Sequence, residues 1–233
     1  MSTSPGLLGD TAARDYSHKL RLFNAFAEPE LRRVIASLDL KPGARVLDAG
    51  CGTGEVLRWL ADEVGPDGVI VGIDLATAHA AAARASAPAT ALVLQADLLK
   101  APLRSESLDL IWCMNTINHL HDPVAGARQL ASLLRPSGRI ALCQSSVLPD
   151  MYFAWDARLE RQANEAVRQY YRDRYGVSER DLAAVRSMVG VLRQAQLHHV
   201  SAQTFVIERV SPLGAADEAY LTEAIFRNTW GAR

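Results

Sequence analysis

The chain has 233 residues, of which 49% are hydrophobic and 22% charged, enough for one globular domain with additions. Its 25 Lys and Arg balance its 26 Asp and Glu, so no global field attracts a polyanion and no nucleic-acid partner is expected. The three cysteines lack metal-ligand or disulfide spacing, and no apolar run approaches membrane-spanning length. These features predict a cytoplasmic protein without a metal site or a membrane span.

Residues 1–40 form the first predicted unit, an N-terminal tail with cap helices. Residues 1–10 are small, polar and glycine-bearing, as in a mobile tail. Helical periodicity then runs from Thr11 to about Leu38. Because proline disrupts a helix interior, Pro29 predicts a break between two helices.

A strand, a glycine turn and a helix follow between residues 45 and 60. Asp48 ends the strand, and Gly50, Gly52 and Gly54 occupy alternate positions after it. No packing need is evident for three alternating glycines, so they favour close approach of the backbone to a ligand. A structural turn without a ligand is the alternative. The spacing differs from the G-x-G-x-x-G loop of dinucleotide-binding proteins, and the carboxylates of Asp48 and Glu55 disfavour a phosphate.

This segment resembles motif I of the class I S-adenosylmethionine-dependent methyltransferases. The resemblance implies a Rossmann-like, doubly wound, mostly parallel α/β sheet and S-adenosyl-L-methionine as cofactor, with S-adenosyl-L-homocysteine as product. The cofactor-binding residues that it implies here are Asp48, Gly50, Cys51, Gly52 and Gly54. N-terminal helices cover the cofactor and acceptor in this family. Candidate pocket residues are therefore Tyr16, His18, Arg21 and Phe23, with Tyr16 assigned to substrate binding.

The second and third predicted strands also end in acids. Residues 69–74, VIVGID, end at Asp74, 24 residues after Gly50, where an acid binds the ribose hydroxyls of an adenosine. The alternative role of Asp74 is an N-cap for the next helix. The third strand, residues 91–97, ends at Asp97. The resemblance implies that Asp97 accepts from the adenine amino group and that the Leu98 amide meets the ring; Leu75 completes this predicted cofactor set.

The fourth predicted strand, residues 110–113, leads into the polar run NTINHLHDP at residues 115–123. Ligands of open α/β sheets bind at the carboxyl ends of the strands. Asn115 is therefore predicted to contact the methionine part of the cofactor. His119 is predicted to be a general base and a substrate contact, because imidazole titrates near neutrality. A histidine that only structures the loop is the alternative.

Residues 123–134 predict an amphipathic helix, and an Arg-Pro-Ser-Gly turn then opens a fifth strand, which completes a cofactor-binding core over residues 41–146. Residues 147–198 predict a helical lid insertion and the last core helix. Aromatic residues between 149 and 176 suggest an apolar acceptor pocket, with Tyr152 and Trp155 as substrate-binding residues. Packing of the inserted helix on the sheet is the alternative.

Residues 178–195 predict a further helix, opened by an S-x-x-D capping pattern. The last unit, residues 199–233, predicts a sixth strand, HVSAQTFVIERV, and a helix from Gly214 to Trp230. The resembled family adds a seventh strand, for which there is no candidate. Either the sequence is truncated, or the sheet ends differently, or another chain supplies the strand. An unpaired edge would favour association, so a homodimer is expected.

The resemblance implies a transferase that moves a methyl group to an O, N or C nucleophile of an apolar small molecule, as in quinone and secondary-metabolite biosynthesis. The acceptor attacks the methyl in line while the sulfonium leaves as a thioether. A cofactor-binding protein of this fold that does not methylate is the first alternative. A nicotinamide oxidoreductase is the second, disfavoured by the glycine spacing and by the absence of a Tyr-x-x-x-Lys pair.

Overall fold

The computed structural model describes residues 11–145, 151–176 and 184–231. Its centre is a parallel sheet in the order β3-β2-β1-β4-β5. The strands are β1 (Arg45–Ala49), β2 (Val69–Asp74), β3 (Ala91–Gln95), β4 (Leu108–Met114) and β5 (Leu134–Cys143). The strand order reverses between β1 and β4, which is where open α/β sheets form a crevice. The predicted α/β fold class is confirmed.

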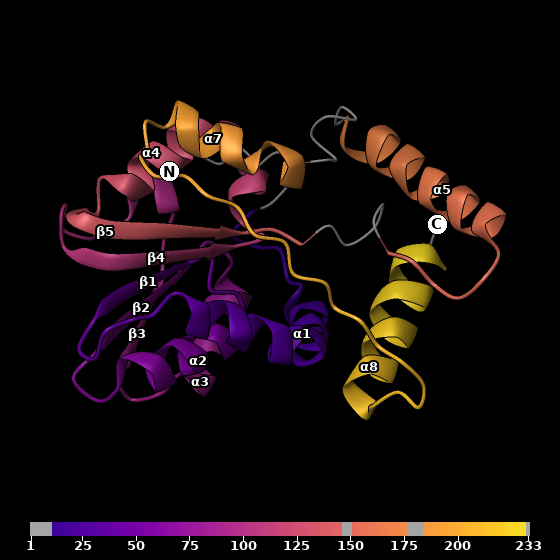
Figure 1. The fold of residues 1–233 in the computed structure, drawn as a ribbon, viewed down its shortest axis with the longest axis horizontal. Coiled ribbons are helices and arrows are strands. Elements are labelled where there is room, and N and C mark those ends of the chain that lie inside the picture. The colour runs from indigo at the N-terminus through magenta and orange to yellow at the C-terminus, as the bar shows by residue number, and fades with distance from the viewer. Residues whose placement is uncertain (1–10, 146–150, 177–183, 232–233) are drawn as a thin grey trace.

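Two layers of helices bury the apolar strands on both faces. Helices α1 (Ser17–Ser37), α2 (Glu55–Val64) and α3 (Thr77–Ser86) lie on one face, and α4 (Pro123–Ala131) and α7 (Met188–Gln194) lie on the other (Figure 1). The side chains of Val46, Leu110 and Trp112 are inaccessible to solvent within the first layer. Those of Leu47 and Ile111, which point the other way, are inaccessible within the second. Burial on both faces explains the continuous apolar runs of these strands.

The N-terminal region differs from the prediction of two helices. Helix α1 continues through Pro29, and residues 11–16 precede it without helical structure. An interior proline costs a helix about 3 kcal/mol. Burial of Phe26, Ala27, Leu31 and Ile35 on both sides of Pro29 offsets that cost. We call residues 11–16 the N-terminal strap; the carbonyl of Ala12 accepts a hydrogen bond from the Thr77 amide at 2.9 Å. The predicted mobile tail, residues 1–10, lies outside the described residues.

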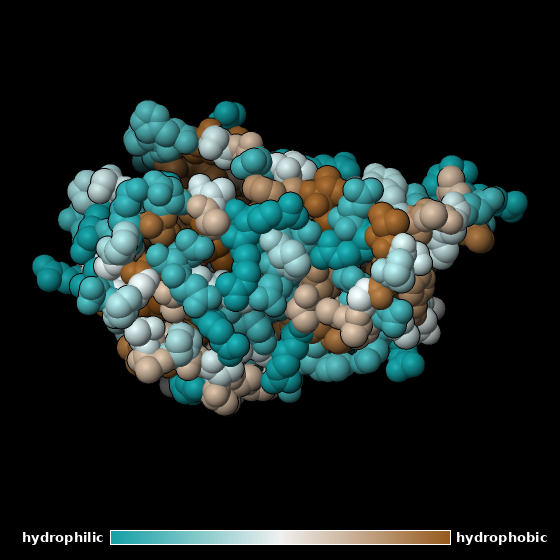
Figure 2. Space-filling view, turned by 60° about the horizontal axis from the view of Figure 1, so that its bottom comes forward, coloured by the Kyte–Doolittle hydropathy of each residue, from teal (hydrophilic) through white to brown (hydrophobic). Residues whose placement is uncertain are grey.

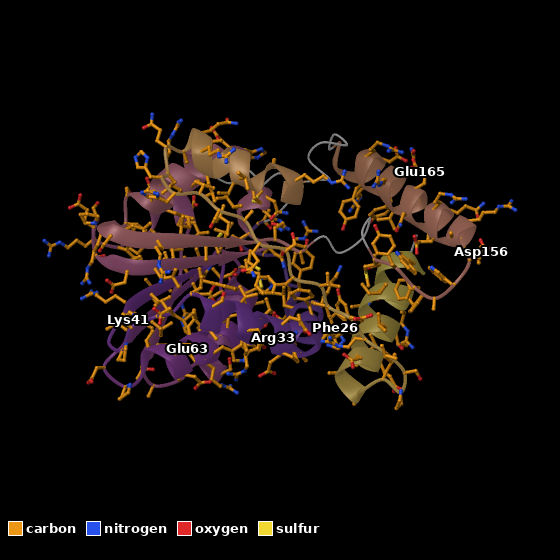
Figure 3. All side chains as sticks on the ribbon, in the orientation of Figure 1. Phe26, Arg33, Lys41, Glu63, Asp156 and Glu165 are labelled. Atoms are coloured by element: carbon orange, nitrogen blue, oxygen red, sulfur yellow. The ribbon has the colours of Figure 1, made fainter. Side chains whose placement is uncertain are left out.

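The predicted helical insertion forms α5 (Ala157–Tyr175), which lies beside the C-terminal helix and away from the sheet (Figure 1). Its polar side chains face outward, as Asp156 at its N-cap and Glu165 show in Figure 3. Val167 is its one buried side chain among those described. The start of the next predicted helix and its S-x-x-D cap fall outside the described residues. The structure resumes with a 3-10 turn, η3 (Ala184–Ser187), and α7.

The predicted sixth strand is wrong for the described chain, because residues 201–210 pair with no strand. Val206 and Val210 are 76% and 75% exposed, so these two apolar side chains of the segment pack against no sheet. The segment leads instead to α8 (Ala215–Ala219) and to η4 (Tyr220–Trp230), a π-helix. These two form the predicted C-terminal helix. Among the described strands, β5 is one edge of the sheet.

Arg209 attaches this segment to α1. Its guanidinium donates hydrogen bonds to both oxygens of Glu30, at 3.1 and 2.8 Å, and to Asp217 at 2.7 Å. It also donates to the carbonyl of Phe26 and lies over the Phe26 ring, 4.9 Å from its centre. Phe26 in turn stacks on Tyr220 of η4. In Figure 3 the labelled Phe26 lies on the side of α1 that is next to the C-terminal helix. One partly buried cation thus joins three segments.

The surface gives a further view of the molecule. On the face shown in Figure 2, hydrophilic residues predominate and hydrophobic residues form separate small patches. None of the described helices has the length and apolarity needed to cross a membrane.

Candidate active site

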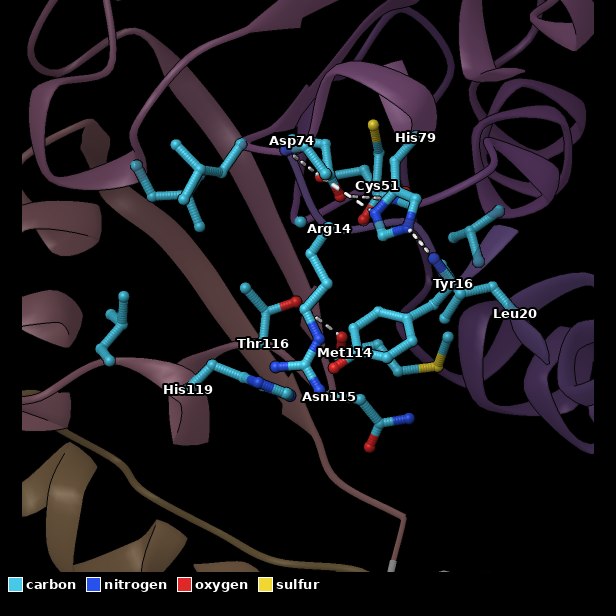
Figure 4. A pocket seen from close by; sticks show the side chains of 18 of the residues that line it. Arg14, Tyr16, Leu20, Cys51, Asp74, His79, Met114, Asn115, Thr116 and His119 are labelled. Carbon is cyan, nitrogen blue, oxygen red and sulfur yellow. Dashed lines mark hydrogen bonds and ion pairs between the residues drawn. The ribbon is translucent and has the colours of Figure 1, made fainter. Parts of the chain in front are cut away.

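A cavity of about 290 Å³ opens at the carboxyl ends of the strands, beneath the N-terminal strap (Figure 4). That volume is near the lower limit for small-molecule sites. It combines the glycine turn after β1 with residues that follow β2, β3 and β4. The residues that line it are Thr11, Arg14, Tyr16, Leu20, Phe23, Asn24, Asp48, Gly50, Cys51, Gly52, Val56, Asp74, Leu75, Ala76, His79, Asp97, Leu98, Met114, Asn115, Thr116, His119 and Leu120.

The glycine turn has the left-handed backbone that its sequence predicted. The φ angles of Gly50, Gly52 and Gly54 are +84°, +53° and +90°. The structure corrects the inference that packing does not require these glycines. A Cβ on Gly50 would lie 2.1 Å from Thr116 Oγ1, and one on Gly54 would lie 2.9 Å from the backbone of Ala83. Neighbouring protein therefore requires both glycines, whatever the cavity binds.

Asp48 lies at the floor of the cavity as a buried acid. It is 2% exposed, and its Oδ2 atom has no hydrogen-bond partner. Burial raises the pKa of this carboxyl to about 8, and the negative charges of Asp74 and Glu55 add to the shift. A cation placed against Asp48 would supply both the missing partner and the missing positive charge.

Asp74 holds the glycine turn as well as lining the cavity. Its Oδ2 accepts from the Gly52 amide and its Oδ1 from the Ala76 amide, both at 2.9 Å. Oδ1 also lies 3.3 Å from Nδ1 of His79. The N-cap of α3 is Ala76, so the alternative role of Asp74 as that N-cap is wrong. Asp74 instead forms a turn two residues before the helix, and its carboxylate stays beside the cavity.

Asp97, Leu98 and Leu75 lie where the sequence prediction required, at the wall formed by the ends of β2 and β3. Asp97 also caps the short 3-10 helix η1 (Leu98–Lys100), because its Oδ1 accepts from the Leu99 amide at 2.9 Å. Cys51 lines the same cavity and is 5% exposed, and burial raises the pKa of its thiol. It behaves as a small apolar wall residue.

Asn115 directly follows β4 and has a left-handed backbone, with a φ of +50°. Its Oδ1 accepts from the Ser145 amide at 2.8 Å, from Ser145 Oγ at 3.0 Å and from Gln144 Nε2 at 3.0 Å. The amide oxygen is thus committed to the residues after β5. The Nδ2 group is the part of this side chain left to meet a ligand in the cavity.

His119 lines the opposite end of the cavity from Asp74. It ends the 3-10 helix η2 (Ile117–His119), and Leu120 follows it along the wall. The guanidinium of Arg14 points toward this end in Figure 4. The cavity therefore has an acidic end, formed by Asp48, Asp74 and Asp97, and an end that offers nitrogen groups from Arg14, Asn115 and His119.

Four N-terminal residues were pocket candidates, and two of them line the cavity. Tyr16 and Phe23 do so, whereas Arg21 is exposed and His18 pairs at the surface with Glu223 at 2.8 Å. The reason is the single helix: α1 turns only one face toward the glycine loop, and His18 and Arg21 lie on another.

Three other predicted site residues lie outside the cavity wall. Gly54 is the N-cap of α2, packed against α3. Tyr152 is 78% exposed, and Trp155 stacks on Trp230 with ring centres 5.3 Å apart. Trp155, Phe153, Phe226 and Trp230 contact one another as an aromatic cluster. The rings therefore pack this segment onto the C-terminal helix. Packing was the alternative to a substrate pocket, but the partner is η4 and not the sheet.

Sequence reasoning missed several residues of the cavity. Arg14, Asn24 and His79 line the cavity but were not among the predicted site residues. In the structure Asn24 is buried, and its Nδ2 donates to Glu55 at 2.7 Å, while Thr53 Oγ1 donates to the same oxygen at 2.6 Å. The hydrogen bond from Asn24 to Glu55 holds α1 against the residue that follows the glycine turn. The only signal was a polar Asn among the apolar positions of an amphipathic helix.

The donors and acceptors of the cavity fit S-adenosylmethionine. The buried Asp48 Oδ2 atom without a partner suits an ammonium, and Asp74 and Asp97 offer carboxylate oxygens to hydroxyl and amino groups. Leu98 and Leu75 give apolar walls for a ring. No group of three potential metal ligands from His, Cys, Asp and Glu occurs in the part of the chain that the structure describes.

Comparisons with known proteins find similarity to methyltransferases. Residues 47–142 match the family model described as "Methyltransferase domain". The chain is 38% identical over 121 residues to Nocamycin O-methyltransferase of Saccharothrix syringae, covering 50% of this chain and 43% of that protein. It is 31% identical over 122 residues to 27-O-demethylrifamycin SV methyltransferase of Amycolatopsis mediterranei, covering 50% and 44%. The matches thus span less than half the length of these relatives.

A solved structure supports the fold. A S-adenosylmethionine-dependent methyltransferase from Aquifex aeolicus superposes with a TM-score of 0.52 at 24% identity, covering 65% of this chain and 88% of that one. The matched residues 47–142 begin within β1, include the glycine turn and continue into β5, and they supply the acids and the polar loop of the cavity. Residues 47–142 thus match a methyltransferase domain, and the sheet that contains them has the strand order and glycine turn of the class I S-adenosylmethionine-dependent methyltransferase fold.

Proposed function

We propose that the whole protein is an S-adenosylmethionine-dependent methyltransferase that acts on an apolar small molecule. The observation that carries the proposal is the single cavity in which the glycine turn, the unpartnered Asp48 and two further strand-end acids come together. The relatives named for methylation of nocamycin and a demethylrifamycin support a small-molecule acceptor, and one of their names specifies O-methylation.

The residues that would hold the cofactor divide along the cavity. Asp74 would accept from ribose hydroxyls, and Asp97 and Leu98 would receive the adenine at the ends of β2 and β3. Asp48 would face the ammonium, and the Nδ2 group of Asn115 would face an oxygen of the methionine part. When bound, the cofactor supplies a methyl group on a sulfonium, an electrophile that needs no further activation.

The chain's own contribution to the reaction is alignment and exclusion of water. Such alignment is worth about 7–11 kcal/mol in well-oriented systems. His119 lies at the acceptor end and would take the proton of an acceptor hydroxyl, a step worth about 10²- to 10⁴-fold. The strap and α1 cover the cavity with Tyr16, Leu20 and Phe23, which keep its mouth apolar.

Calorimetric titration of the purified chain with S-adenosylmethionine, S-adenosylhomocysteine and NADH tests the cofactor. We expect the two sulfur nucleosides to bind and NADH not to bind. Asp74→Asn should weaken binding about 10- to 150-fold, as for a hydrogen bond to a charged group. NADH binding without sulfur-nucleoside binding would contradict the proposal.

Transfer of a labelled methyl group to a panel of hydroxylated polyketides and quinols tests catalysis. Turnover is expected, and His119→Asn should lower kcat with less change in the affinity for S-adenosylhomocysteine. Binding of cofactor without transfer to any acceptor would favour a protein of this fold that does not methylate.

The balanced charge supports a small-molecule partner over a nucleic acid, and a cytoplasmic location accords with three free thiols. A homodimer would give β5 a partner, since β5 is an edge among the described strands. Light scattering of the purified chain distinguishes monomer from dimer.

A further inference from the structure

We propose that His79 is a positioning residue that couples closure of the N-terminal strap to the carboxylate of Asp74. The inference rests on the proposed function, in which Asp74 binds the cofactor's ribose. His79 lies on α3 and is 7% exposed. Its side chain faces the cavity between the N-terminal strap and the carboxylate of Asp74 (Figure 4). Nothing in the proposed reaction otherwise uses this buried imidazole.

The hydrogen bonds of His79 define its tautomer. Its Nε2 atom lies 2.9 Å from the backbone nitrogen of Tyr16. A backbone N–H can only donate, so Nε2 accepts and carries no proton. The proton of the neutral ring is then on Nδ1, which donates to Oδ1 of Asp74 at 3.3 Å. One ring nitrogen therefore serves the strap and the other serves the carboxylate.

Further contacts continue this connection on both sides. The Tyr16 ring stacks on the imidazole with centres 6.1 Å apart, and the guanidinium of Arg14 lies 4.3 Å from the centre of the Tyr16 ring. On the other side, Asp74 holds the Gly52 amide at 2.9 Å. A continuous set of contacts thus runs from the strap, through His79, to the glycine turn.

Strap position and cofactor occupancy should consequently influence each other. A ligand that binds the closed strap arrangement better than the open one must favour closure, and closure must raise the affinity by the same factor. The strap is also held by the 2.9 Å hydrogen bond from the Thr77 amide to the carbonyl of Ala12. Thr77 opens the helix that carries His79, so both anchors belong to α3.

Two isosteric substitutions separate the two bonds. The side-chain amide of Asn reaches about as far as Nδ1, so His79→Asn keeps a donor for Asp74 and loses the acceptor for Tyr16. Gln reaches about as far as Nε2, so His79→Gln keeps an acceptor for Tyr16 and loses the donor to Asp74. His79→Leu loses both. His18→Leu removes an exposed histidine near the strap and is the matched control.

The test uses the 233-residue chain. Hydrogen exchange of the Tyr16 amide is measured with and without S-adenosylhomocysteine, and the affinity for this ligand is measured by calorimetry. In the wild type the ligand should slow Tyr16 exchange at least about 10-fold. His79→Asn should accelerate exchange in the free protein, whereas His79→Gln should leave it near the wild-type rate. Both should lose the ligand-dependent slowing, and His79→Leu should lower affinity about 10- to 100-fold. His18→Leu should change neither quantity.

The outcomes are distinct. If S-adenosylhomocysteine slows Tyr16 exchange equally in the wild type and in both amide variants, direct ligand contact orders the strap and the role of His79 is overturned. The same holds if affinity is unchanged in all three variants. If the wild type binds no sulfur nucleoside, the proposed function fails instead. Should His79→Leu not fold, the two amide variants still decide the question.

Discussion

The sheet domain, residues 45–143, and the C-terminal region, residues 151–231, are held together in different ways. In the first, parallel strands bury their side chains on both faces and carry the cavity at their carboxyl ends. In the second, α5 is largely exposed and residues 201–210 pair with no strand, whereas α7 and η4 each bury side chains in one of the two helical layers and Arg209 holds the intervening segment on α1. The described wall of the site comes from the first region together with the N-terminal strap and α1, and none of its residues comes from the second region.

The two regions also respond differently to sequence change. Backbone positions in the glycine turn are fixed by protein atoms within van der Waals distance, whereas the aromatic cluster consists of side chains that can repack. We therefore expect substitutions in the sheet domain to alter both folding and ligand binding. Substitutions in the C-terminal region should alter folding alone.

Asp48→Asn should give the largest effect, seen in the pH dependence of stability. The folded-state pKa of Asp48 is about 8, against an ordinary value of 3.8. Between those values the folded state holds a proton that the unfolded state has lost, so stability falls as pH rises, by about 1.4 kcal/mol per unit at most. The stability advantage of Asp48→Asn over wild type should grow by about 4 kcal/mol from pH 5 to pH 8.

Urea unfolding at four pH values checks this prediction. Asp67→Asn, in an exposed turn, is the control and should follow the wild type. Parallel curves for Asp48→Asn and wild type would contradict the assigned burial of the carboxyl.

Gly50→Ala should destabilise the fold by about 3 kcal/mol. The new methyl group would meet Thr116 at 2.1 Å, and the backbone would keep a φ of +84°. Gly176→Ala is the matched control, because Gly176 has a left-handed backbone at φ +64° but no atom within 4 Å of the added Cβ. It should cost only about 1 kcal/mol. Equal losses in denaturant unfolding would show that strain alone, without the contact to Thr116, requires Gly50.

Arg209→Met should cost about 2 kcal/mol at neutral pH, because it leaves the buried Glu30 without its main partner. Hydrogen bonds from Arg209 lower the pKa of Glu30, so this stabilisation is present above the ordinary pKa of 4.5 and is lost as pH falls through the folded-state value. Arg33→Met also removes a partner of Glu30, but Arg33 is 68% exposed and should contribute less than about 0.5 kcal/mol.

Unfolding curves at pH 7 and pH 3 separate these cases. The affinity for S-adenosylhomocysteine should stay within about 2-fold in Arg209→Met, as for a group remote from a ligand. A large loss of affinity would mean that the C-terminal region reaches the site.

Trp155→Ala should have the smallest effect on the site. The ring contacts other aromatic rings and does not line the cavity. We expect the calorimetric affinity for S-adenosylhomocysteine to change less than about 2-fold. Leu20→Ala, which does open the cavity wall, should weaken binding about 10-fold, as for a lost apolar contact. If Trp155→Ala weakens binding as much as Leu20→Ala, the aromatic cluster closes over the ligand after all.

The sequence specified the sheet well because its signals are local. Each of these signals indicates one position in a β-turn-α unit. They are the apolar runs of strand length, the alternating glycines, and acids such as Asp74 and Asp97. The cavity residues that follow those strands were therefore predicted correctly in position. The roles assigned to them remain predictions, His119 as a base above all.

The errors came from features that depend on partners distant in sequence. Pro29 looked like a helix end, but burial of the flanking residues against the core keeps α1 continuous. Val206 and Val210 belong to a segment whose composition suggested a strand, but the segment pairs with no strand of the sheet. His79 was overlooked because its importance lies in Tyr16, 63 positions away, and in Asp74. Hydrophobic periodicity carries no information about contacts between residues that are distant in the sequence.

The distribution of the cavity residues along the chain has a consequence for biosynthesis. Every lining residue that the structure describes lies between Thr11 and Leu120, and the five strands end at Cys143. The ribosome therefore makes the entire described wall of the site before it reaches residue 121. The strands and the cavity wall are thus available for folding during translation before α7 and η4, which complete the two helical layers, have been made.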